Sequence, residues 1–421
     1  MGKQLLSDVL SVIKPNLREL GEETRFAAEL VDRISKNAPP DTNVVLTGSI
    51  AKKTFLRHHR DIDVFILFSR SVPKEKLGPA VREVMVSAFP KTGYQLSYAE
   101  HPYIRFHYKG RKVDLVPAYR ISKAEERMSA VDRSVLHTRY VKKHLSAEQR
   151  DDVLLLKQFL RANEIYGAEI KIKGFSGYLC ELLIIKYGSF PRLVKAAAKW
   201  KPPVFIDLEK YHSKKNIPHA IGRFGDFVVI DPTDSERNVA AAVSTDNFRK
   251  FISLCRSFIK KPSKRLFFRK PLSFEQRLSR ARGNHKLVVS MPRPDVVDDV
   301  LWGQLHRLIR MLSNHLSEFK PKKIIADDSR HLVRLGIVLE KGKLSPRMLV
   351  PGPPLEMKEN VKRFKSRHRG AKFIKKKNRL YAERKRPARE AETAMKMFFR
   401  KFSESDSHLA YPEEMVVIRV Q

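Results

Sequence analysis

Hydrophobic residues recur at two different spacings along the chain. In residues 3–37 they recur every three or four positions, which predicts two amphipathic helices. Residues 44–46 and 64–68 are instead continuous apolar runs, which are typical of buried strands. We expect a short helix over residues 50–57 and another over about 77–89. Three more strand-like segments follow: residues 95–100, 103–108 and 112–119.

Helical spacing dominates the chain from about residue 149. It predicts three helices: residues 149–163, 177–187 and about 246–260. Lys260-Lys261-Pro262-Ser263 then has the composition of a domain boundary. Beyond it the pattern predicts a small α/β unit: strand 286–290, helix 300–319 and strands near 322–326 and 331–340. The chain is therefore expected to be a multidomain α+β protein.

The composition is that of a globular protein with a strong basic excess. Hydrophobic residues make up 42% of the 421 residues, which is enough for several cores. Lys and Arg number 84 against 46 Asp and Glu, and the net charge of +38 favours a polyanionic partner such as RNA, DNA or an anionic membrane. No apolar run is long enough to span a membrane. The two cysteines exclude a disulfide framework and fit a reducing cytoplasm.

Basic residues are concentrated in one late segment. Residues 361–389 contain 14 Lys or Arg and one acidic residue, Glu383. Such a run is usually a solvated face or a disordered tail. Interleaved aromatic and branched residues instead favour a helix followed by a hairpin that turns at Lys377-Asn378. A basic, partly aromatic surface of this kind suits a phosphate backbone.

Candidate chemistry lies in the stretch Thr47–Phe68. Gly48-Ser49 offers backbone N–H groups and a hydroxyl to a phosphate. Asp61 and Asp63 are two positions apart at the start of a strand, so both project from the same face. Adjacent carboxylates repel each other, and a hard divalent cation, most simply Mg²⁺, relieves that repulsion. The alternative, a solvated turn or a helix cap, is less favoured because the Gly-Ser pair stands between two strands.

A third carboxylate stands inside an apolar run on a later strand. Asp114 interrupts the sequence Val113-Asp114-Leu115-Val116, and a buried Asp must be paired or functional. The alternative is a capping or salt-bridging Asp near a strand edge. Together with Asp61 and Asp63, Asp114 would complete a two-cation site and take a proton from a hydroxyl.

Several longer blocks carry a family resemblance. They include GSIAKKTFLRHHRDIDVFILF, YAEHPYIRFHYKGRKVDLVPAY, SAVDRSVLH, LLKQFLRANEIYGAE, KGFSGYLCELLI and VIDPTDSERNVAAAVSTDN. With these blocks the chain resembles the archaeal (class I) CCA-adding enzymes, which are tRNA nucleotidyltransferases of the DNA polymerase beta-like superfamily. The Gly-Ser and D-x-D combination is common to the superfamily, whereas the IYGAE, GFSGYLCELL and DP–ERNVAA blocks are specific to this family.

The resemblance implies an α+β fold with a nucleotidyltransferase palm sheet, a helical neck, a small α/β body and a basic tail. The expected parts are a catalytic head over 1–135, a helical neck that recognises the base over 136–260, an α/β body over 261–351, a basic RNA-binding tail over 352–390 and a return to the body over 391–421.

The resemblance also implies roles for single residues. The expected catalytic and metal-binding residues are Asp61, Asp63 and Asp114. The expected nucleotide-binding residues are Gly48, Ser49, Lys52, His137, Lys157, Tyr166 and Arg237. Arg237 would reach the base edge, with Asn238 supporting it.

Without the family blocks, four of these residues have ordinary interpretations: a surface or capping His137, a solvated Lys157, a packing Tyr166 and an Arg237 paired with Asp234. Two positions also depart from the family pattern. Lys52 stands where Arg is common, and Asp61 where Glu is frequent; both keep the charge.

The implied activity is template-independent addition of C, C and A to the 3′ end of tRNA from CTP and ATP. Two Mg²⁺ ions would assist the phosphoryl transfer, and pyrophosphate would leave. The basic tail would clamp the acceptor stem and T arm by their shape, in the cytoplasm and without a membrane partner. Two alternatives remain: another template-independent RNA nucleotidyltransferase, such as a poly(A) polymerase, and a non-catalytic RNA-binding protein on the same scaffold. The sequence also leaves a homodimer open.

Overall fold

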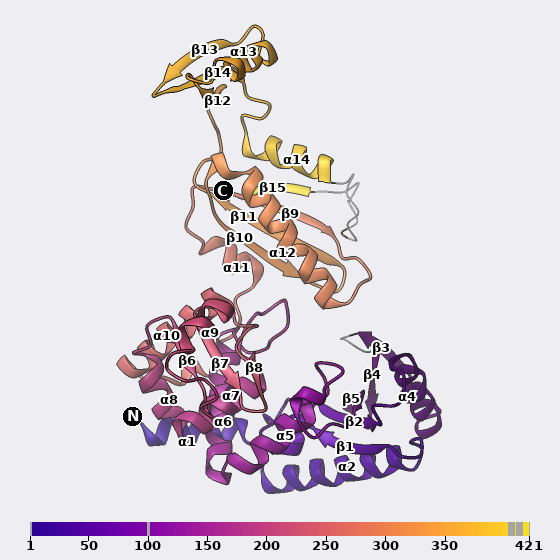
Figure 1. Cartoon of the computed structure of the whole chain (residues 1–421). Coiled ribbons are helices and arrows are strands. Elements are labelled where there is room, and N and C mark those ends of the chain that lie inside the picture. The colour runs from indigo at the N-terminus through magenta and orange to yellow at the C-terminus, as the bar shows by residue number, and fades with distance from the viewer. Residues whose placement is uncertain (1, 99–101, 403–408, 410–415, 421) are drawn as a thin grey trace. The chain divides into compact units, whose positions relative to one another are not determined.

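Strand β2 (Ile62–Phe68) is buried along nearly its whole length, as its apolar run predicts, and it joins the two halves of the N-terminal sheet. In the computed structural model the sheet order is β1-β2-β5-β4-β3 (Figure 1). The other strands are β1 (Asn43–Thr47), β3 (Tyr94–Tyr98), β4 (Pro102–Tyr108) and β5 (Arg111–Tyr119). Strands β2 and β5 are parallel, and the other neighbouring pairs are antiparallel.

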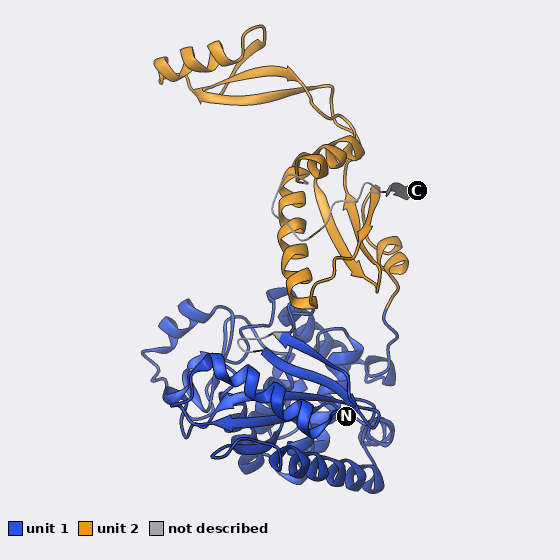
Figure 2. Cartoon of the chain, turned by 90° about the vertical axis from the view of Figure 1, so that its right-hand side faces the viewer, with its two compact units in different colours: residues 1–271 blue, residues 272–421 orange. Residues whose placement is uncertain are grey.

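The structure describes residues 2–98, 102–402, 409 and 416–420. They form two compact units, residues 1–271 and 272–421 (Figure 2). The end of the strand predicted over 95–100 and much of the segment 403–421 lie outside the described residues. The expected multidomain α+β fold is confirmed, whereas the five-part division of the chain stays a prediction.

The two faces of the N-terminal sheet have different covers. Helices α2 (Leu17–Ser35) and α4 (Lys74–Ala88) pack on one face, where Phe26, Leu30, Val81 and Met85 meet side chains of β2, β4 and β5. The opposite face carries Phe65, Leu67, Val116 and Ala118, which pack against Val135 of α5 (Arg133–His144). Because side chains alternate along a strand, Asp63 shares this second face with Phe65.

Helix α3 (Gly48–Lys52) is shorter than the helix predicted over 50–57, and that prediction was wrong at its C-terminal end. Lys53 has a φ of 56°, in the left-handed region, which ends the helix and leaves the Lys53 side chain exposed. Residues 53–60 therefore form turns that lead into β2.

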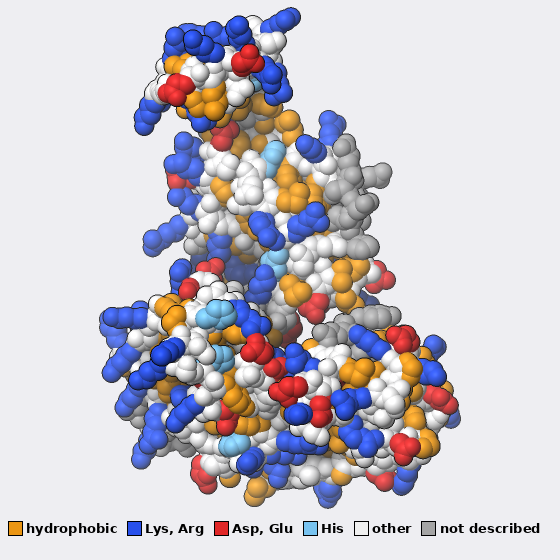
Figure 3. Space-filling model, viewed as in Figure 1, with side chains coloured by type: hydrophobic (Ala, Val, Ile, Leu, Met, Phe, Trp, Pro, Cys, Tyr) orange, Lys and Arg blue, Asp and Glu red, His pale blue; other side chains and the backbone are white. Residues whose placement is uncertain are grey.

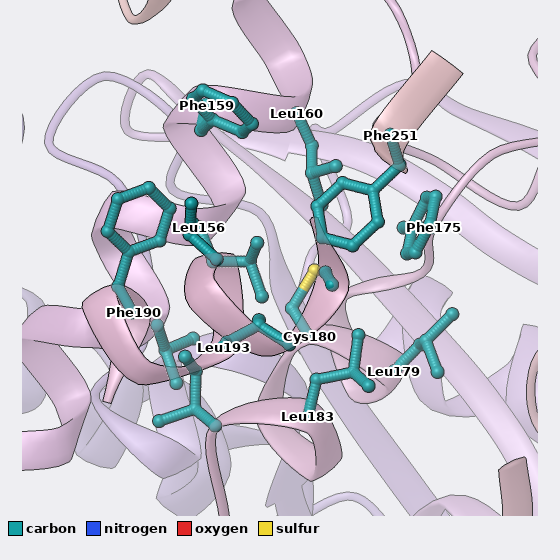
Figure 4. Packing of buried hydrophobic residues seen from close by; sticks show 14 of the residues in the cluster. Leu156, Phe159, Leu160, Phe175, Leu179, Cys180, Leu183, Phe190, Leu193 and Phe251 are labelled. Carbon is teal, nitrogen blue, oxygen red and sulfur yellow. The ribbon is translucent and has the colours of Figure 1, made fainter. Parts of the chain in front are cut away.

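A helical core fills the rest of the first unit. Its helices are α1 (Lys3–Ile13), α6 (Ala147–Ala162), α7 (Gly177–Tyr187), α8 (Phe190–Ala197), α9 (Ile217–Phe224) and α10 (Thr245–Lys260). Figure 4 shows buried side chains from α6, α7, α8 and α10 meeting in this core, among them Leu156, Cys180 and Phe251. Ser146, Ser176 and Ser244 cap α6, α7 and α10 at their N-termini.

A small three-stranded sheet adjoins these helices. Its strands, in the order β6-β7-β8, are β6 (Val204–Ile206), β7 (Phe227–Asp231) and β8 (Asp234–Asn238). The predicted turn at Asp231-Pro232 joins β7 to β8, so this hairpin carries the DP–ERN block into the core. None of the strands β6, β7 and β8 was predicted.

The second unit contains a four-stranded sheet in the order β10-β11-β9-β15. Its strands are β9 (His285–Pro292), β10 (Pro321–Asp328), β11 (Leu332–Leu339) and β15 (Val416–Val420). Helices α12 (Asp298–His315) and α14 (Ala391–Phe402) share its hydrophobic core, and α11 (Phe274–Ser279) packs in a smaller cluster with Ile325 and Val338. Short 3₁₀ turns occur at Ala124–Glu126, Lys264–Leu266 and Ser317–Phe319.

The basic segment is ordered, as its interleaved apolar residues predict. It comprises β12 (Arg347–Pro354), α13 (Lys358–Arg367), β13 (Lys372–Lys376) and β14 (Arg379–Lys385), with the strands in the order β12-β14-β13. The predicted hairpin at Lys377-Asn378 is confirmed, but β12 was not predicted. None of the described helices in the chain is both long and apolar enough to cross a membrane.

Candidate nucleotidyl-transfer site

Two carboxylates meet where β2 and β5 run side by side. Asp63 on β2 and Asp114 on β5 are direct partners in the parallel register. Each follows a buried apolar residue, Ile62 or Val113, that points to the opposite face of the sheet. The apolar pattern of the two strands therefore aligns both carboxylates on the face that α5 covers.

Asp63 is in an environment that disfavours its charged form. Burial, reinforced by the negative charges of Asp114 and Asp61, raises the pKa of Asp63 to about 6. Lys52 and Lys112 offset only part of this effect. Burial is therefore the main reason that the charged form of Asp63 is disfavoured, and the neighbouring carboxylates add to it.

Gly48 lies directly against the Asp63 carboxylate. An added Cβ on Gly48 would stand 1.9 Å from Asp63 Oδ2, and the Gly48 φ of +68° is also unfavourable for other residues. The neighbouring Ser49, in the first turn of α3, is half-buried. The Gly-Ser pair and Asp63 are thus brought together, as the sequence predicts.

Asp61 does not converge with the other two carboxylates. It lies just before β2, its side chain is 60% exposed, and Lys112 Nζ lies 2.7 Å from its Oδ2. It lines a second cavity of about 570 Å³ with Arg57, His58 and Arg111 among its neighbours. Of the three predicted carboxylates, the structure therefore brings Asp63 and Asp114 together, and Asp61 lies apart from them.

Asp114 is held by a cation on the neighbouring strand. Arg105 on β4 is paired with Asp114 in the sheet register, and its Nε and Nη2 each donate a hydrogen bond of 2.8 Å to Asp114. Asp114 also lines a cavity that Asp63 shares. The bidentate contact fixes the plane of the carboxylate.

A cavity of about 300 Å³ opens beside Asp63 and Asp114. Its lining residues are Thr47, Gly48, Lys52, Asp63, Phe65, Tyr103, Asp114, Val116, Val131, Ser134, His137, Thr138 and Tyr178. They come from the sheet, α3, α5 and α7, so segments far apart in the sequence form one site. Four of the predicted nucleotide-binding or catalytic residues besides Asp63 line it directly: Gly48, Lys52, Asp114 and His137.

A buried carboxylate organises the side of the site that α5 and α7 form. Asp231, at the end of β7, has no exposed surface, and its Oδ2 is 2.8 Å from His137 Nε2 and accepts a hydrogen bond of 2.8 Å from Arg237. Tyr178 donates its hydroxyl to Asp231 Oδ1 at 3.0 Å, and its ring stacks on His137 with 4.0 Å between the ring centres. Asp231 therefore connects His137, Tyr178 and Arg237.

The charges in this cluster follow from burial and pairing. Burial lowers the pKa of His137 below its ordinary value, so the ring is neutral at pH 7 and its Nε2–H donates to Asp231. Burial alone would raise the pKa of Asp231, but hydrogen bonds from His137 and Thr233 and the charge of Arg237 hold that pKa well below its usual range.

Arg237 also lines a neighbouring cavity of about 400 Å³. Asn238 uses its amide on the backbone of Phe227, Val229 and Ala240, so it has a structural role.

Lys157 and Tyr166 lie behind the cavity wall. Lys157 is 2% exposed, and its ammonium group donates to the carbonyl oxygen of Thr54 at 2.8 Å. An added Cβ on Gly177 would stand 3.2 Å from Tyr166 Oη and 3.6 Å from Lys157 Nζ, so both side chains lie beside the start of α7. The ordinary interpretation of Lys157 as a solvated charge was wrong, because the side chain is buried.

The donor set at Asp63 and Asp114 suits a divalent cation. Both offer the hard oxygen ligands that divalent cations such as Mg²⁺ prefer. Within residues 2–98 and 102–402 no three His, Cys, Asp or Glu side chains lie close enough together to enclose an ion. Asp61, the third predicted ligand, is paired with Lys112 in the structure.

Two buried acids in the site were not identified from the sequence, Glu181 and Asp231. Glu181 stands in the apolar run Leu179–Ile184 of α7, and Asp231 ends the apolar strand β7. A single charge in a fully apolar run was the available signal, because burying a charge requires a partner.

Three family models match successive parts of the chain. Residues 27–137 match the family model of the nucleotidyltransferase domain, residues 151–268 that of the tRNA nucleotidyltransferase second domain, and residues 282–407 that of the CCA-adding enzyme C-terminal domain.

Curated relatives match over most of their length. The CCA-adding enzyme of Methanocaldococcus jannaschii is 36% identical over 388 residues, covering 89% of this chain and 85% of the relative. The CCA-adding enzyme of Methanosarcina acetivorans is 38% identical over 379 residues, covering 87% and 82%. Among solved structures, one of the Cid1 poly(U) polymerase superposes with a TM-score of 0.50 at 15% identity, over 64% of this chain and 98% of that chain, which shows a shared fold alone.

Proposed function

The chain belongs to the CCA-adding enzymes, a family of tRNA nucleotidyltransferases, and from this membership we propose that the cavity beside Asp63 and Asp114 is its nucleotide site. The protein adds C, C and A to the 3′ end of tRNA from CTP and ATP without a template. The observation that carries the proposed site is the register pairing of Asp63 with Asp114 beside Gly48.

The triphosphate lies against α3 in this proposal. The Ser49 hydroxyl and the Lys52 ammonium group bind phosphate oxygens, and the positive φ of Gly48 lets the backbone approach them. Lys157 and Tyr166 support this end of the site from behind Lys52. CTP and ATP carry the same triphosphate, so the Lys52 ammonium group contributes equally to the binding of both nucleotides.

Nucleotidyltransferase domains use a divalent metal ion, and we propose Mg²⁺ here. Asp63 and Asp114 would hold it, and Asp61 would be the third ligand in place of its contact with Lys112. A bound divalent cation neutralises charge at the α-phosphate and acidifies the attacking hydroxyl.

Asp114 is the proposed base of the transfer. Arg105 orients its carboxylate, and Asp114 accepts the proton of the tRNA 3′-hydroxyl. The 3′-oxygen then bonds to the α-phosphorus of the nucleotide while the bond to the bridging oxygen breaks, and pyrophosphate leaves.

Base selection is assigned to the other end of the site. Arg237 reaches the base edge, and its contact with the Asp231 carboxylate fixes the direction of its guanidinium group. His137 and Tyr178, stacked on each other, form the wall between the base and the triphosphate. Discrimination between bases then depends on which hydrogen-bond donors and acceptors are left without a partner when a wrong base enters.

The segment 352–390 is the proposed tRNA clamp, directed at the acceptor stem and T arm. Fourteen of its basic side chains are exposed: Lys358, Lys362, Arg363, Lys365, Arg367, Arg369, Lys372, Lys375, Lys376, Lys377, Arg379, Arg384, Lys385 and Arg389. On the face drawn in Figure 3, Lys and Arg side chains cover much of the surface of the elements β12, α13, β13 and β14. An A-form helix exposes phosphates and 2′-hydroxyls to such a surface, so it is recognised by shape. tRNA maturation of this kind is assigned to the cytoplasm.

The test uses tRNA trimmed of its 3′-terminal CCA and each labelled nucleotide, with MgCl₂. We expect incorporation of C before A and a stop after three additions, and no addition by Asp63→Asn. Unlimited addition of A without C would identify a poly(A) polymerase instead. Binding of tRNA without addition of any nucleotide would identify a non-catalytic RNA-binding protein.

A further inference from the structure

A buried group of charges lies behind the nucleotide cavity. Glu181, on α7, is fully buried, and Lys52 Nζ donates to its Oε2 at 2.5 Å. Thr54 Oγ1 donates to Oε1 at 2.6 Å, and Lys157 Nζ lies 3.4 Å from the same oxygen. One carboxylate therefore contacts two ammonium groups, and the three charges sum to one positive charge.

The two ammonium groups need this carboxylate to remain charged side by side. Lys52 is 8% exposed and Lys157 is 2% exposed, so water screens their mutual repulsion poorly. Burial alone would raise the pKa of Glu181, but the charges of Lys52 and Lys157 and the hydrogen bonds keep it below its ordinary value. Glu181 is therefore ionised at neutral pH and supplies the counter-charge.

Glu181 does not reach the cavity itself, but Lys52 does. Lys52 lines the cavity beside Asp63 and His137, and its ammonium group lies 5.9 Å from the centre of the Tyr178 ring. The helix that carries Glu181 also carries Tyr178, so α7 presents the ring and anchors the lysine on one rigid element. The position of the Lys52 charge is thus set by a residue outside the cavity.

We propose that Glu181 is a positioning residue for nucleotide binding, which holds the Lys52 and Lys157 ammonium groups in place and keeps both protonated for the incoming triphosphate. The proposal rests on the nucleotide site proposed above. Thr54, on the turn after α3, fixes the carboxylate through its hydroxyl and so determines where Lys52 is held.

The variant Glu181→Gln removes the counter-charge while preserving the shape. Two buried ammonium groups then face each other, and one of them releases its proton below the ordinary lysine range. Nucleotide affinity should therefore depend on pH between 7.5 and 9.5 in the variant and be nearly flat in the unchanged protein.

Other groups around the two lysines keep one charge state in that pH range. Those facing Lys52 and Lys157 are Glu181, Tyr178 and Cys180 of α7, Asp63 of β2, His137 of α5 and Tyr166. Burial raises the pKa of Cys180 to about 12 and the pKa values of both tyrosines above their ordinary value, so these groups stay neutral. The pKa of Asp63, about 6, and the lowered pKa of His137 lie below the range.

The experiment is a titration of the full-length protein with CTP and with ATP at constant MgCl₂ and without tRNA, at pH 7.5 and 9.5, read by calorimetry. We expect the Kd of Glu181→Gln to rise about tenfold between the two pH values, the effect of losing roughly one charge contact. Unchanged protein should differ less than twofold. Equal affinities of the variant and the unchanged protein at both pH values would overturn the proposal.

A matched control separates this role from general stability. Glu23 is also a fully buried carboxylate held by two cations, Arg60 and Arg111, but it does not line the nucleotide cavity. Glu23→Gln should lower the melting temperature and leave the pH dependence of nucleotide binding flat. A pH dependence as steep in Glu23→Gln as in Glu181→Gln would also overturn the proposal.

Thr54→Val tests the geometry if Glu181→Gln does not fold. It keeps the charges of Lys52, Lys157 and Glu181 and removes the Thr54 hydroxyl, which donates to Glu181 Oε1 and accepts from Lys157 Nζ at 3.2 Å. We expect nucleotide affinity several-fold weaker, by the same factor at both pH values, because one net hydrogen bond is worth about 1 kcal/mol. Wild-type affinity would contradict the positioning role. If the unchanged protein binds neither nucleotide, the proposed nucleotide site itself fails.

Discussion

The carboxylate of Asp63 lies so close to Gly48 that no side chain fits between them: an added Cβ would stand 1.9 Å from Asp63 Oδ2. Gly48→Ala should therefore displace Asp63 from its partner Asp114. We expect kcat to fall about 100-fold, the effect of a misplacement of about 1 Å. The left-handed φ of +68° should also destabilise the fold by about 1–2 kcal/mol. Steady-state addition of C to trimmed tRNA and thermal unfolding measure the two effects.

Gly110 provides the matched control for this substitution. Its φ is +74°, but nothing lies within 4 Å of the position of an added Cβ. Gly110→Ala should have a similar effect on stability and leave kcat within about twofold of the unchanged protein. Equal losses of activity in the two variants would show that strain, and not the contact with Asp63, explains the effect.

Asp63→Asn should stabilise the metal-free protein while abolishing nucleotide addition. The folded-state pKa of about 6 is above the ordinary value of 3.8, so the fold favours the protonated acid. The Asp63 contribution to the free energy of unfolding therefore falls as pH rises from about 4 to about 6 and stays low above that. At pH 7.5 the amide should be more stable by up to about 3 kcal/mol, and the difference should vanish near pH 3.5. Denaturant unfolding with EDTA at both pH values measures this.

Asp61→Asn serves as the comparison for the stability effect. Asp61 is 60% exposed and paired with Lys112, so removing its charge should change stability by less than about 1 kcal/mol. MgCl₂ should raise the melting temperature of the unchanged protein and have little effect on Asp63→Asn. A stabilisation of Asp63→Asn that persists unchanged to pH 3.5 would show that its charge is not the cause.

Asp231→Asn should loosen base selection. The carboxylate accepts hydrogen bonds from His137, Tyr178 and Arg237, so the amide leaves the Arg237 guanidinium group without its charged partner. We expect a loss of stability of about 3–5 kcal/mol and about a tenfold smaller preference for CTP over UTP. The measurement is kcat/KM for each nucleotide on trimmed tRNA.

The control for Asp231→Asn is Glu236→Gln, on the same hairpin. Glu236 forms an exposed ion pair with Arg223, and its side chain is 64% exposed. Its loss should leave both stability and nucleotide preference nearly unchanged. An unchanged preference in Asp231→Asn as well would separate Arg237 from base selection.

Removing charge from the β13–β14 hairpin should weaken tRNA binding without slowing the chemistry. The variant replaces Lys375, Lys376, Lys377 and Arg379 by Ala, all of which are exposed. Each lost phosphate contact should reduce the slope of log affinity against log salt by about 0.7 to 0.9. Filter binding of tRNA measures the slope at KCl concentrations from about 50 to about 300 mM, a range that includes physiological salt. At saturating tRNA, kcat should remain unchanged.

Four exposed basic residues in the first unit provide the comparison: Arg70, Lys74, Lys76 and Lys91. Their replacement by Ala removes the same net charge from a different surface. It should leave the salt slope nearly unchanged, because charge alone does not define a contact. Equal slopes in the two variants would refute a specific clamp in the segment 352–390.

Local pattern was enough to predict most of the regular structure. The apolar run of 64–68, the helical spacing of 149–163 and the turn at Lys377-Asn378 correspond to β2, α6 and the β13–β14 hairpin. The helix predicted over 50–57 ends at Lys52. The strands β6, β7, β8, β12 and β15 and the helices α5, α8, α9, α11 and α14 were not expected. Short strands depend on partners that are distant in the sequence, and the left-handed Lys53 has no local signal comparable to a glycine.

The sequence by itself determined that Asp63 follows the Gly-Ser turn on a buried strand and that Asp63 and Asp114 each share a face with the polar side of their strand, because side chains alternate along a strand. Only the tertiary structure decided that Asp61 pairs with Lys112, that Lys157 is buried against Thr54, and that Glu181 and Asp231 organise the two ends of the site. These contacts join residues from 6 to 129 positions apart. A buried charge needs a partner, but that partner can come from any part of the chain that the fold places nearby. The spacing of residues along the sequence therefore does not predict which residue the partner is.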